Sequence, residues 1–293
     1  MAPFAVILLL AGCAPPLDTD ALPAACNGSA ALCDRTFDTV TLPGTHNSMS
    51  NEDDGWSIPN QRHNLGQQLD DGIRAMLIDS HDWDPDGDGV SAPYLCHAYC
   101  ELGAIPLVDA LTTVRTFLDD RPGEVMAFII EDYISTDETD AAFDAADLSR
   151  LTFTPTAGQI AGSEAWPTLG AMVAADQRLL VTSENQGPPP DWYEPAWSLY
   201  VDTPYTFAGV ADFNCDINRG DPSNPLFLLN HWLEDPTSRS DLAAEANAYD
   251  VLNARATECA AAFGRNPNIV AVDWYDEGDL FAVVGDLNAA YQK

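Results

Sequence analysis

Short apolar runs alternate along the chain with longer segments in which apolar residues recur at helical spacing. Eight of these runs have the length of buried strands and are followed by polar or turn-forming residues. They cover residues 37–42, 73–78, 91–97, 125–131, 178–182, 198–202, 226–230 and 269–273. Because strands that alternate with helices usually pair in parallel, the pattern predicts an α/β fold of the TIM-type (β/α) barrel class, in a regular or irregular form.

The size and composition of the chain agree with one barrel domain over residues 35–293. The 293 residues are 46% hydrophobic, which is enough for one sizeable core, and no internal repeat divides them. Acidic residues number 46 against 12 basic ones, so the formal net charge is −34. Such a charge repels nucleic acids, and we therefore expect no nucleic-acid partner. We also expect a monomer.

Polar side chains stand where several of the predicted strands end. They are His46 and Asn47 after the first strand, Asp79, His97, Glu131 and Asp273. Since the carboxyl ends of barrel strands form one rim, we expect these side chains to converge on a single mouth.

Five segments of the sequence resemble a known family. They are "LPGTHNSM", "GIRAMLID", "LCHAYCELGAIPLVDAL", "EVMAFIIEDYI" and "NPNIVAVDWYDEGD". In this order and spacing they resemble the catalytic barrel of the phosphatidylinositol-specific phospholipase C X-domain-like phosphodiesterases, in their exported bacterial branch. The resemblance covers most of residues 35–288.

This resemblance implies a phosphodiesterase in which the inositol hydroxyl beside the phosphate attacks phosphorus, giving a cyclic inositol phosphate and diacylglycerol. A base must take the proton of that hydroxyl and an acid must protonate the leaving oxygen, and imidazoles can do both near neutral pH. By family position, His46 is the expected base or phosphate-stabilising residue and His97 the expected general acid. Asp273 is expected to orient one imidazole, as carboxylates do in catalytic triads.

The resemblance also implies that the charge of the phosphate is neutralised by a calcium ion or by an arginine. Three side chains at the strand ends favour calcium, because they offer the oxygen ligands that it prefers: Asn47, Asp79 and Glu131. The calcium type usually has another carboxylate two residues before Asp79, where this chain has Leu77, so we expect weak binding. If calcium is not needed, Arg74 or Arg219 is the expected contact of the substrate phosphate.

Two alternatives to this function stay open. One is a surface lipoprotein on the same barrel that binds a polyol or cyclic phosphate without turnover. The other is a phosphodiesterase of the glycerophosphodiester or sphingomyelinase D type, which also uses paired histidines with a divalent metal. In the main interpretation the partner is a phospholipid or another inositol phosphodiester.

The first residues predict export. An apolar stretch of about ten residues, too short to span a bilayer, ends in "LAGC", which resembles a bacterial lipobox. We expect residues 1–12 to be a lipoprotein signal peptide and Cys13 to carry lipid, with residues 13–34 as a tether to the membrane of the bacterial cell envelope. Ordinary secretion is the alternative, because no Lys or Arg precedes the apolar run.

Export predicts disulfides, since thiols outside the cytoplasm usually become oxidised. Pairing near neighbours joins Cys26 with Cys33, Cys96 with Cys100, and Cys215 with Cys259. Closing these two short loops removes less entropy from the unfolded chain than closing a long loop does. We therefore expect the Cys96–Cys100 ring to serve mainly by holding His97 in one orientation.

Overall fold

The computed structural model describes residues 23–234 and 240–290. Its principal strands are β1 (Leu42–Thr45), β2 (Ala75–Trp83), β5 (Met126–Asp132), β6 (Leu179–Ser183), β7 (Tyr193–Pro195), β8 (Tyr200–Asp202), β9 (Leu226–His231) and β10 (Ile269–Val272). They pair in parallel in the order β7-β6-β5-β2-β1-β10-β9-β8. Strands β7 and β8 end this order and are joined by the short helix α7 (Ala196–Leu199), so the barrel is irregular. The predicted fold class is confirmed.

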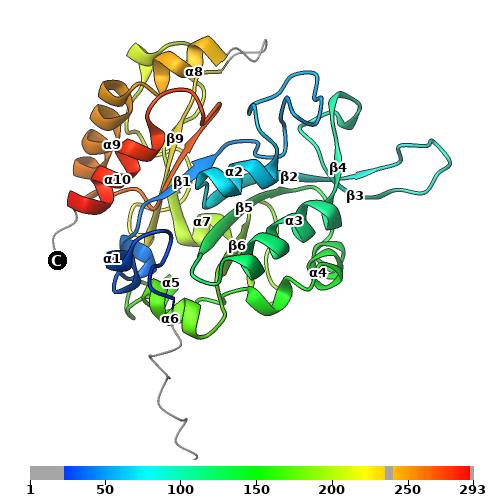
Figure 1. The fold of residues 1–293 in the computed structure, drawn as a ribbon, viewed down its shortest axis with the longest axis horizontal. Coiled ribbons are helices and arrows are strands. Elements are labelled where there is room, and N and C mark those ends of the chain that lie inside the picture. Colours follow the sequence, from blue (N-terminus) through cyan, green and yellow to red (C-terminus); the bar gives the residue numbers. More distant parts are fainter. Residues whose placement is uncertain (1–22, 235–239, 291–293) are drawn as a thin grey trace, which may run out of the picture.

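Helices lie between the strands along the chain and cover the outside of the sheet (Figure 1). They are α1 (Ala30–Cys33), α2 (Leu65–Asp71), α3 (Leu107–Asp120), α4 (Thr136–Ala145), α5 (Ala157–Ile160), α6 (Leu169–Ala174), α8 (Ser240–Ala246), α9 (Tyr249–Phe263) and α10 (Leu280–Ala290). Single 3₁₀ turns are η2 (Phe37–Thr39), η3 (Cys100–Leu102), η4 (Ser149–Leu151) and η5 (Val210–Asp212). Within the described part of the chain, none of the helices has the length and apolarity that a membrane span requires.

Both faces of the central strands are buried, which explains their nearly continuous apolar sequences. In β5, Ile130 packs among the helices, whereas Ile129 belongs to the interior cluster. Because side chains alternate along a strand, the inward face continues from Ile129 to Glu131 at the strand end. The inward face of β2 continues in the same way from Leu77 to Asp79. The inward-facing side chains of β2 and β5 therefore end in the carboxylates Asp79 and Glu131.

Two strand predictions need correction, and one strand was not predicted. Residues 91–97 do not form a barrel strand, because β3 (Ala92–Leu95) pairs antiparallel with the end of β2 and with β4 (Ile105–Pro106) in a hairpin that projects from the barrel (Figure 1). The apolar run 37–42 begins with η2, and only Leu42 belongs to β1. Strand β7, which pairs with β6, is the eighth parallel strand. Its sequence, Tyr-Glu-Pro, contains a charged residue and a proline and therefore does not read as an apolar run.

The segment before residue 35 packs against the start of the barrel strands. Cys26 and Leu32 are buried, and Asn27 bonds both the carbonyl and the amide of Val125, just before β5, at 3.0 and 2.7 Å. This part of the expected tether therefore belongs to the folded domain. The predicted signal peptide and Cys13 lie outside the described residues.

The three predicted disulfides are present: Cys26–Cys33, Cys96–Cys100 and Cys215–Cys259. The last joins α9 to the segment between β8 and β9, whereas the first closes the segment beside β5.

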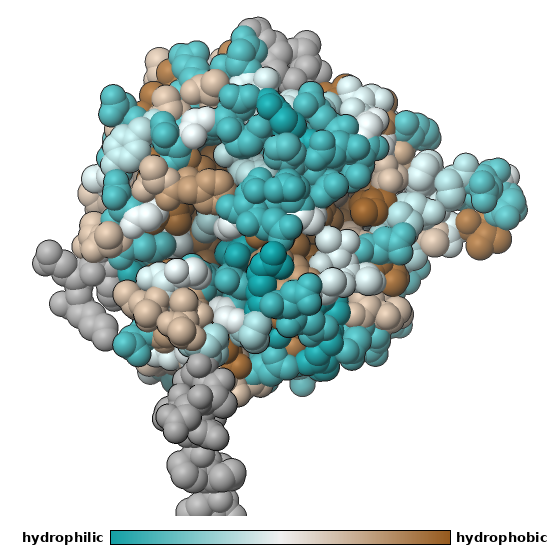
Figure 2. Space-filling view, in the orientation of Figure 1, coloured by the Kyte–Doolittle hydropathy of each residue, from teal (hydrophilic) through white to brown (hydrophobic). Residues whose placement is uncertain are grey.

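Hydrophilic side chains cover most of the face shown in Figure 2, in agreement with the large acidic excess. Some large apolar side chains nevertheless remain exposed. Four of them, Ile58, Tyr99, Leu102 and Tyr205, line one pocket at the strand ends.

Candidate active site

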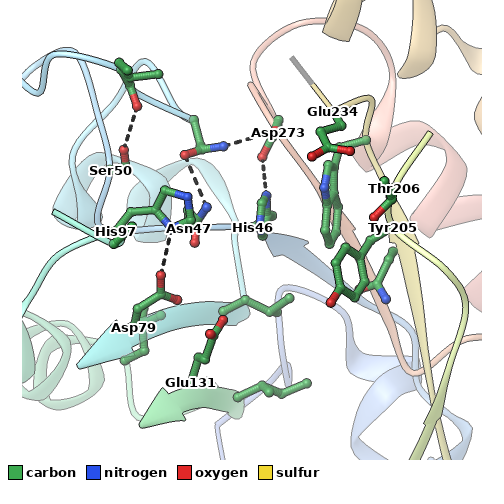
Figure 3. Close-up of a pocket in the computed structure, with 18 of the residues that line it drawn as sticks. His46, Asn47, Ser50, Asp79, His97, Glu131, Tyr205, Thr206, Glu234 and Asp273 are labelled. Carbon is green, nitrogen blue, oxygen red and sulfur yellow. Dashed lines mark hydrogen bonds and ion pairs between the residues drawn. The ribbon is translucent and has the colours of Figure 1, made fainter. Parts of the chain in front are cut away.

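A pocket of about 830 Å³ opens at the carboxyl ends of the parallel strands. The structure brings together seven side chains that the sequence singled out: His46, Asn47, Asp79, His97, Glu131, Arg219 and Asp273. Figure 3 shows all of these except Arg219 with labels. They come from several strands and from the loops that follow them, which is where barrel enzymes carry their catalytic groups.

His46 follows β1 and pairs with Asp273, which follows β10. The Nδ1–H of His46 donates to Oδ1 of Asp273 at 2.8 Å. The other carboxylate oxygen accepts from Nδ2 of Asn60 at 3.2 Å, and Oδ1 of Asn60 accepts from Asn47 at 3.3 Å. Because both oxygens of Asp273 are bonded, its carboxylate plane is fixed and Nε2 of His46 is left for chemistry.

A buried amide fixes the backbone beneath this pair. The Nε2 group of Gln61 donates to the carbonyls of His46 and Val272 at 2.8 and 3.0 Å. Gln61 is fully buried, so these bonds are shielded from water. They join the ends of β1 and β10, the two strands that carry the pair.

His97 lies in the loop between β3 and η3 and pairs with Asp79 on β2. Its Nδ1–H donates to Oδ2 of Asp79 at 2.8 Å. This hydrogen bond raises the pKa of His97 above its ordinary value, although burial acts in the opposite direction. A raised pKa keeps the imidazole protonated to higher pH, as a general acid requires. Asp79, expected as a calcium ligand, thus also orients a histidine.

The loop that carries His97 is closed by the Cys96–Cys100 disulfide. The His97 side chain is 49% exposed, so packing alone does little to hold it. Inside the ring Ala98 has φ +59°, a left-handed conformation that residues other than glycine seldom adopt. The closed ring therefore stabilises a backbone shape that an open loop would readily leave.

The two imidazoles lie close together in the pocket, with the edge of one ring toward the other. Their ring centroids are 6.5 Å apart and their planes are inclined by 76°. Each ring is held through Nδ1 by its own aspartate, which leaves both Nε2 atoms available. Two nitrogen groups on either side of one site form an arrangement suited to paired acid and base catalysis.

Oxygen donors gather at the same strand ends. Asp79 and Glu131 are register neighbours on β2 and β5. The described contacts use Oδ2 of Asp79, Nδ2 of Asn47 and Oε1 of Glu131, the last with the hydroxyl of Tyr133. Each of the three predicted ligands thus retains an oxygen that a calcium ion accepts. Leu77 lines the pocket where a third carboxylate is expected, and within the described residues no three His, Cys, Asp or Glu side chains form a metal-holding group.

The two arginines proposed as phosphate contacts lie in different places. Arg219 lines the pocket, but its guanidinium already bonds Asp202 at 2.7 Å and Glu184 at 2.6 Å. Arg74 directly precedes β2 and bonds Glu124 at 2.6 Å. Because a residue before a parallel strand lies at the opposite rim from its carboxyl end, the structure does not bring Arg74 to the pocket.

Among the pocket side chains that the sequence analysis did not single out are Asn60, Glu184 and Trp232. Glu184 directly follows β6, and burial, with the negative charges of Glu131 and Asp202, raises its pKa to about 7 despite Arg219. Trp232 directly follows β9. Both Glu184 and Trp232 could therefore have been found by looking for side chains that follow a strand. Asn60 lies in a long loop, where no local pattern marks it.

The fold and the pocket together define a phospholipase C-like barrel of the TIM type. The sequence model of the family described as PI-PLC X 1 (PI-PLC_X) matches residues 32–288, and the chain belongs to this family.

Individual relatives agree with this assignment. The PI-PLC X domain-containing protein 1 of Arthroderma benhamiae is 30% identical over 93% of this chain and 93% of its own length. An uncharacterized secreted protein of the same species is 28% identical over 90% of this chain and 64% of its own length. The phosphatidylinositol-specific phospholipase C of Staphylococcus aureus shares the fold, with a TM-score of 0.56 and 14% identity over 89% of this chain and 95% of that chain.

Proposed function

We propose that the protein is a phosphodiesterase of the phosphatidylinositol-specific phospholipase C type, which converts a phosphoinositide-type phosphodiester into a cyclic inositol phosphate and diacylglycerol. One observation carries the proposal: two histidines line one pocket with ring centroids 6.5 Å apart, each held by an aspartate at 2.8 Å. Membership of the PI-PLC X family and the fold shared with the S. aureus enzyme support this class of reaction.

In this reaction His46 acts as the base. Its Nε2 takes the proton of the inositol hydroxyl beside the phosphate while that oxygen attacks phosphorus. Asp273 stabilises the imidazolium that forms. Protonated His97 donates from Nε2 to the oxygen of the leaving alcohol as its bond to phosphorus breaks. One proton is gained by His46 and one is lost by His97, so exchange with water restores both histidines between turnovers.

The lining of the pocket fits the two halves of such a substrate. Near His97 it includes Tyr99 and Leu102, which are 69% and 37% exposed and suit an apolar leaving group. Elsewhere the pocket presents Glu184 and Arg219, which offer hydrogen bonds to the hydroxyls of a polyol ring. An apolar rim beside polar groups favours a lipid with a sugar-like head group.

The proposed calcium ion would be held by Asn47, Asp79 and Glu131, and it would neutralise charge that develops on the phosphate oxygens. Arg219 is already paired with two carboxylates, so it is a weaker candidate for this task. The residues keep their own roles beside the ion. Asp79 orients His97, and Asn47 belongs to the chain of bonds that fixes Asp273.

We further propose that the protein is exported. A relative bears the name of a secreted protein, and three disulfides are typical of a chain that folds outside the cytoplasm. Lipid attachment at Cys13 in a bacterial envelope is part of this proposal. A Cys13→Ser variant is then expected in the soluble fraction, and unchanged fractionation without a lipid mass increment would contradict the anchor.

The function is tested by measuring product release from a panel of phospholipids that differ in head group. Wild type should cleave the inositol lipid, whereas His46→Ala and His97→Ala should each lose at least about a hundredfold in turnover, as expected for loss of a base or acid. The matched control is His63→Ala, because His63 also pairs with an aspartate, Asp53 at 3.1 Å, but lies outside the residues that line the pocket. Cleavage of another head group in preference, or near-normal turnover without either histidine, would overturn the proposal.

A further inference from the structure

We propose that Trp232 is a positioning residue for His46, whose indole ring fixes the plane in which the imidazole acts. The inference rests on the proposed role of His46 as the base and extends it to a residue that does not itself touch the reacting atoms.

The contact between the two rings is close and parallel. The ring centroids of His46 and Trp232 are 3.9 Å apart and their planes differ by only 5°. Trp232 is 7% exposed, so its indole is a buried surface and not a mobile flap. It directly follows β9, a strand whose residues from Leu226 to His231 are all buried.

The hydrogen bond to Asp273 cannot fix the imidazole by itself. It restrains the distance from Nδ1 of His46 to the carboxylate oxygen, but coupled changes of χ1 and χ2 can still tilt the ring while that distance is kept. A flat apolar surface at stacking distance removes this freedom, because rotation would push the ring edge into the indole. The bond and the stack together set the direction of Nε2.

Trp232 also contacts a second aromatic ring. The ring of Tyr205 stacks on it with centroids 6.0 Å apart and planes at 23°. The guanidinium of Arg219 lies 5.0 Å from the Tyr205 ring and is anchored by Asp202 and Glu184. The indole is therefore connected through Tyr205 and Arg219 to two carboxylates, and these contacts limit its movement. His97 has no such support, since the ring contact described for it is the edge contact with His46.

Substitution of Trp232 should affect turnover more than binding. Trp232→Leu removes the flat surface, and kcat should fall by about 10- to 100-fold with KM changed less than about threefold, because small misplacements of a reacting group are costly. Trp232→Phe keeps a planar ring and should recover most of the lost kcat. The control is Trp166→Leu, since Trp166 is equally buried but packs against Phe37 and Phe153 away from the pocket. It should lower stability and leave kcat unchanged.

A double-mutant cycle decides whether Trp232 acts through His46. In a His46→Ala background, Trp232→Leu should change the residual rate by less than about twofold, because the group that it positions is gone. In a His97→Ala background it should keep its full effect. An equal loss in all backgrounds would show a general structural role and overturn the proposal.

A spectroscopic measurement keeps the geometry separate from the reaction. The ring protons of His46 lie over the indole and should show an upfield ring-current shift in the proton NMR spectrum, which Trp232→Leu removes. If wild type cleaves no inositol phosphodiester, the proposed function fails whatever the spectrum shows. If wild type is active and Trp232→Leu loses the shift but keeps kcat, the proposed function stands and the positioning role of Trp232 fails.

Discussion

Removal of the disulfide around His97 should separate activity from stability. The change is Cys96→Ala together with Cys100→Ala, and the matched control is Cys26→Ala together with Cys33→Ala. The bonded cysteines are 4 positions apart in the first pair and 7 in the second. From loop closure entropy, their removal should cost about 2 and about 2.5 kcal/mol of unfolding free energy respectively. The two variants are therefore nearly equivalent in stability.

They should differ strongly in turnover. His97 is 49% exposed and its loop contains Ala98 at φ +59°, so an open loop can relax and turn the imidazole away from the pocket. A displacement of about 1 Å at a catalytic group can cost about a hundredfold in rate, and we expect kcat to fall by this amount in the Cys96/Cys100 variant. The Cys26/Cys33 pair lies beside Val125, at the start of β5, and its loss should leave kcat within about twofold, as for changes distant from the site.

Urea unfolding and turnover of a water-soluble inositol phosphodiester measure the two effects on the same samples. The soluble substrate separates the chemical step from binding to a lipid surface. Equal kcat in both disulfide variants, at equal loss of stability, would refute the idea that the closed ring orients His97.

The other predictions concern charges in the pocket. Asp79→Asn replaces the charged partner that raises the pKa of His97 with a neutral amide, so the alkaline limb of the kcat/KM profile should move to lower pH, and an unmoved limb would contradict the role of Asp79. In wild type the stabilisation from this pair should be complete below the ordinary histidine pKa of 6.5 and be lost as pH rises through the raised value, which unfolding curves at several pH values can follow. Glu184 ionises at a pKa of about 7, so KM for the soluble substrate should change around pH 7 in wild type but not in Glu184→Gln, and parallel pH profiles would exclude Glu184 from substrate binding. Excess chelator should abolish activity, and added calcium should restore it. Glu131→Gln should impair activity, whereas Leu77→Glu should lower the calcium concentration that activity requires. Full activity after exhaustive chelation would exclude calcium.

Much of the barrel could be predicted because burial of a parallel strand on both faces leaves a continuous apolar run. The runs that became β5 and β10 show this directly. The same pattern was misleading at residues 91–97, since a hairpin that extends from β2 has an apolar sequence like that of a barrel strand. Strand β7 was missed because its sequence, Tyr-Glu-Pro, contains a charged residue and a proline, whereas the equally short β8 lies in an apolar run.

The position of polar residues after apolar runs was sufficient to identify both histidines and their aspartate partners. This pattern could not show which hydrogen bonds these side chains form. Asp79 carries oxygen atoms, so the sequence was consistent with a metal ligand, but its bond to His97 depends on a loop that returns 18 residues later. Arg74 illustrates the opposite case. Its place before β2 puts it at the far rim, a conclusion that needs the exact start of the strand.

The central claim is that His46 is the base and His97 the acid of one phosphodiester cleavage. Its most direct test is kcat/KM of wild type, His46→Ala and His97→Ala on two soluble inositol phosphodiesters, one with an alkyl alcohol as the leaving group and one with a nitrophenol. A nitrophenolate leaves without protonation, so His97→Ala should lose about 10²- to 10⁴-fold on the alkyl substrate but less than about tenfold on the aryl substrate, while His46→Ala loses heavily on both. An equal loss for His97→Ala on the two substrates, or rescue of His46→Ala by the nitrophenol, would contradict the account.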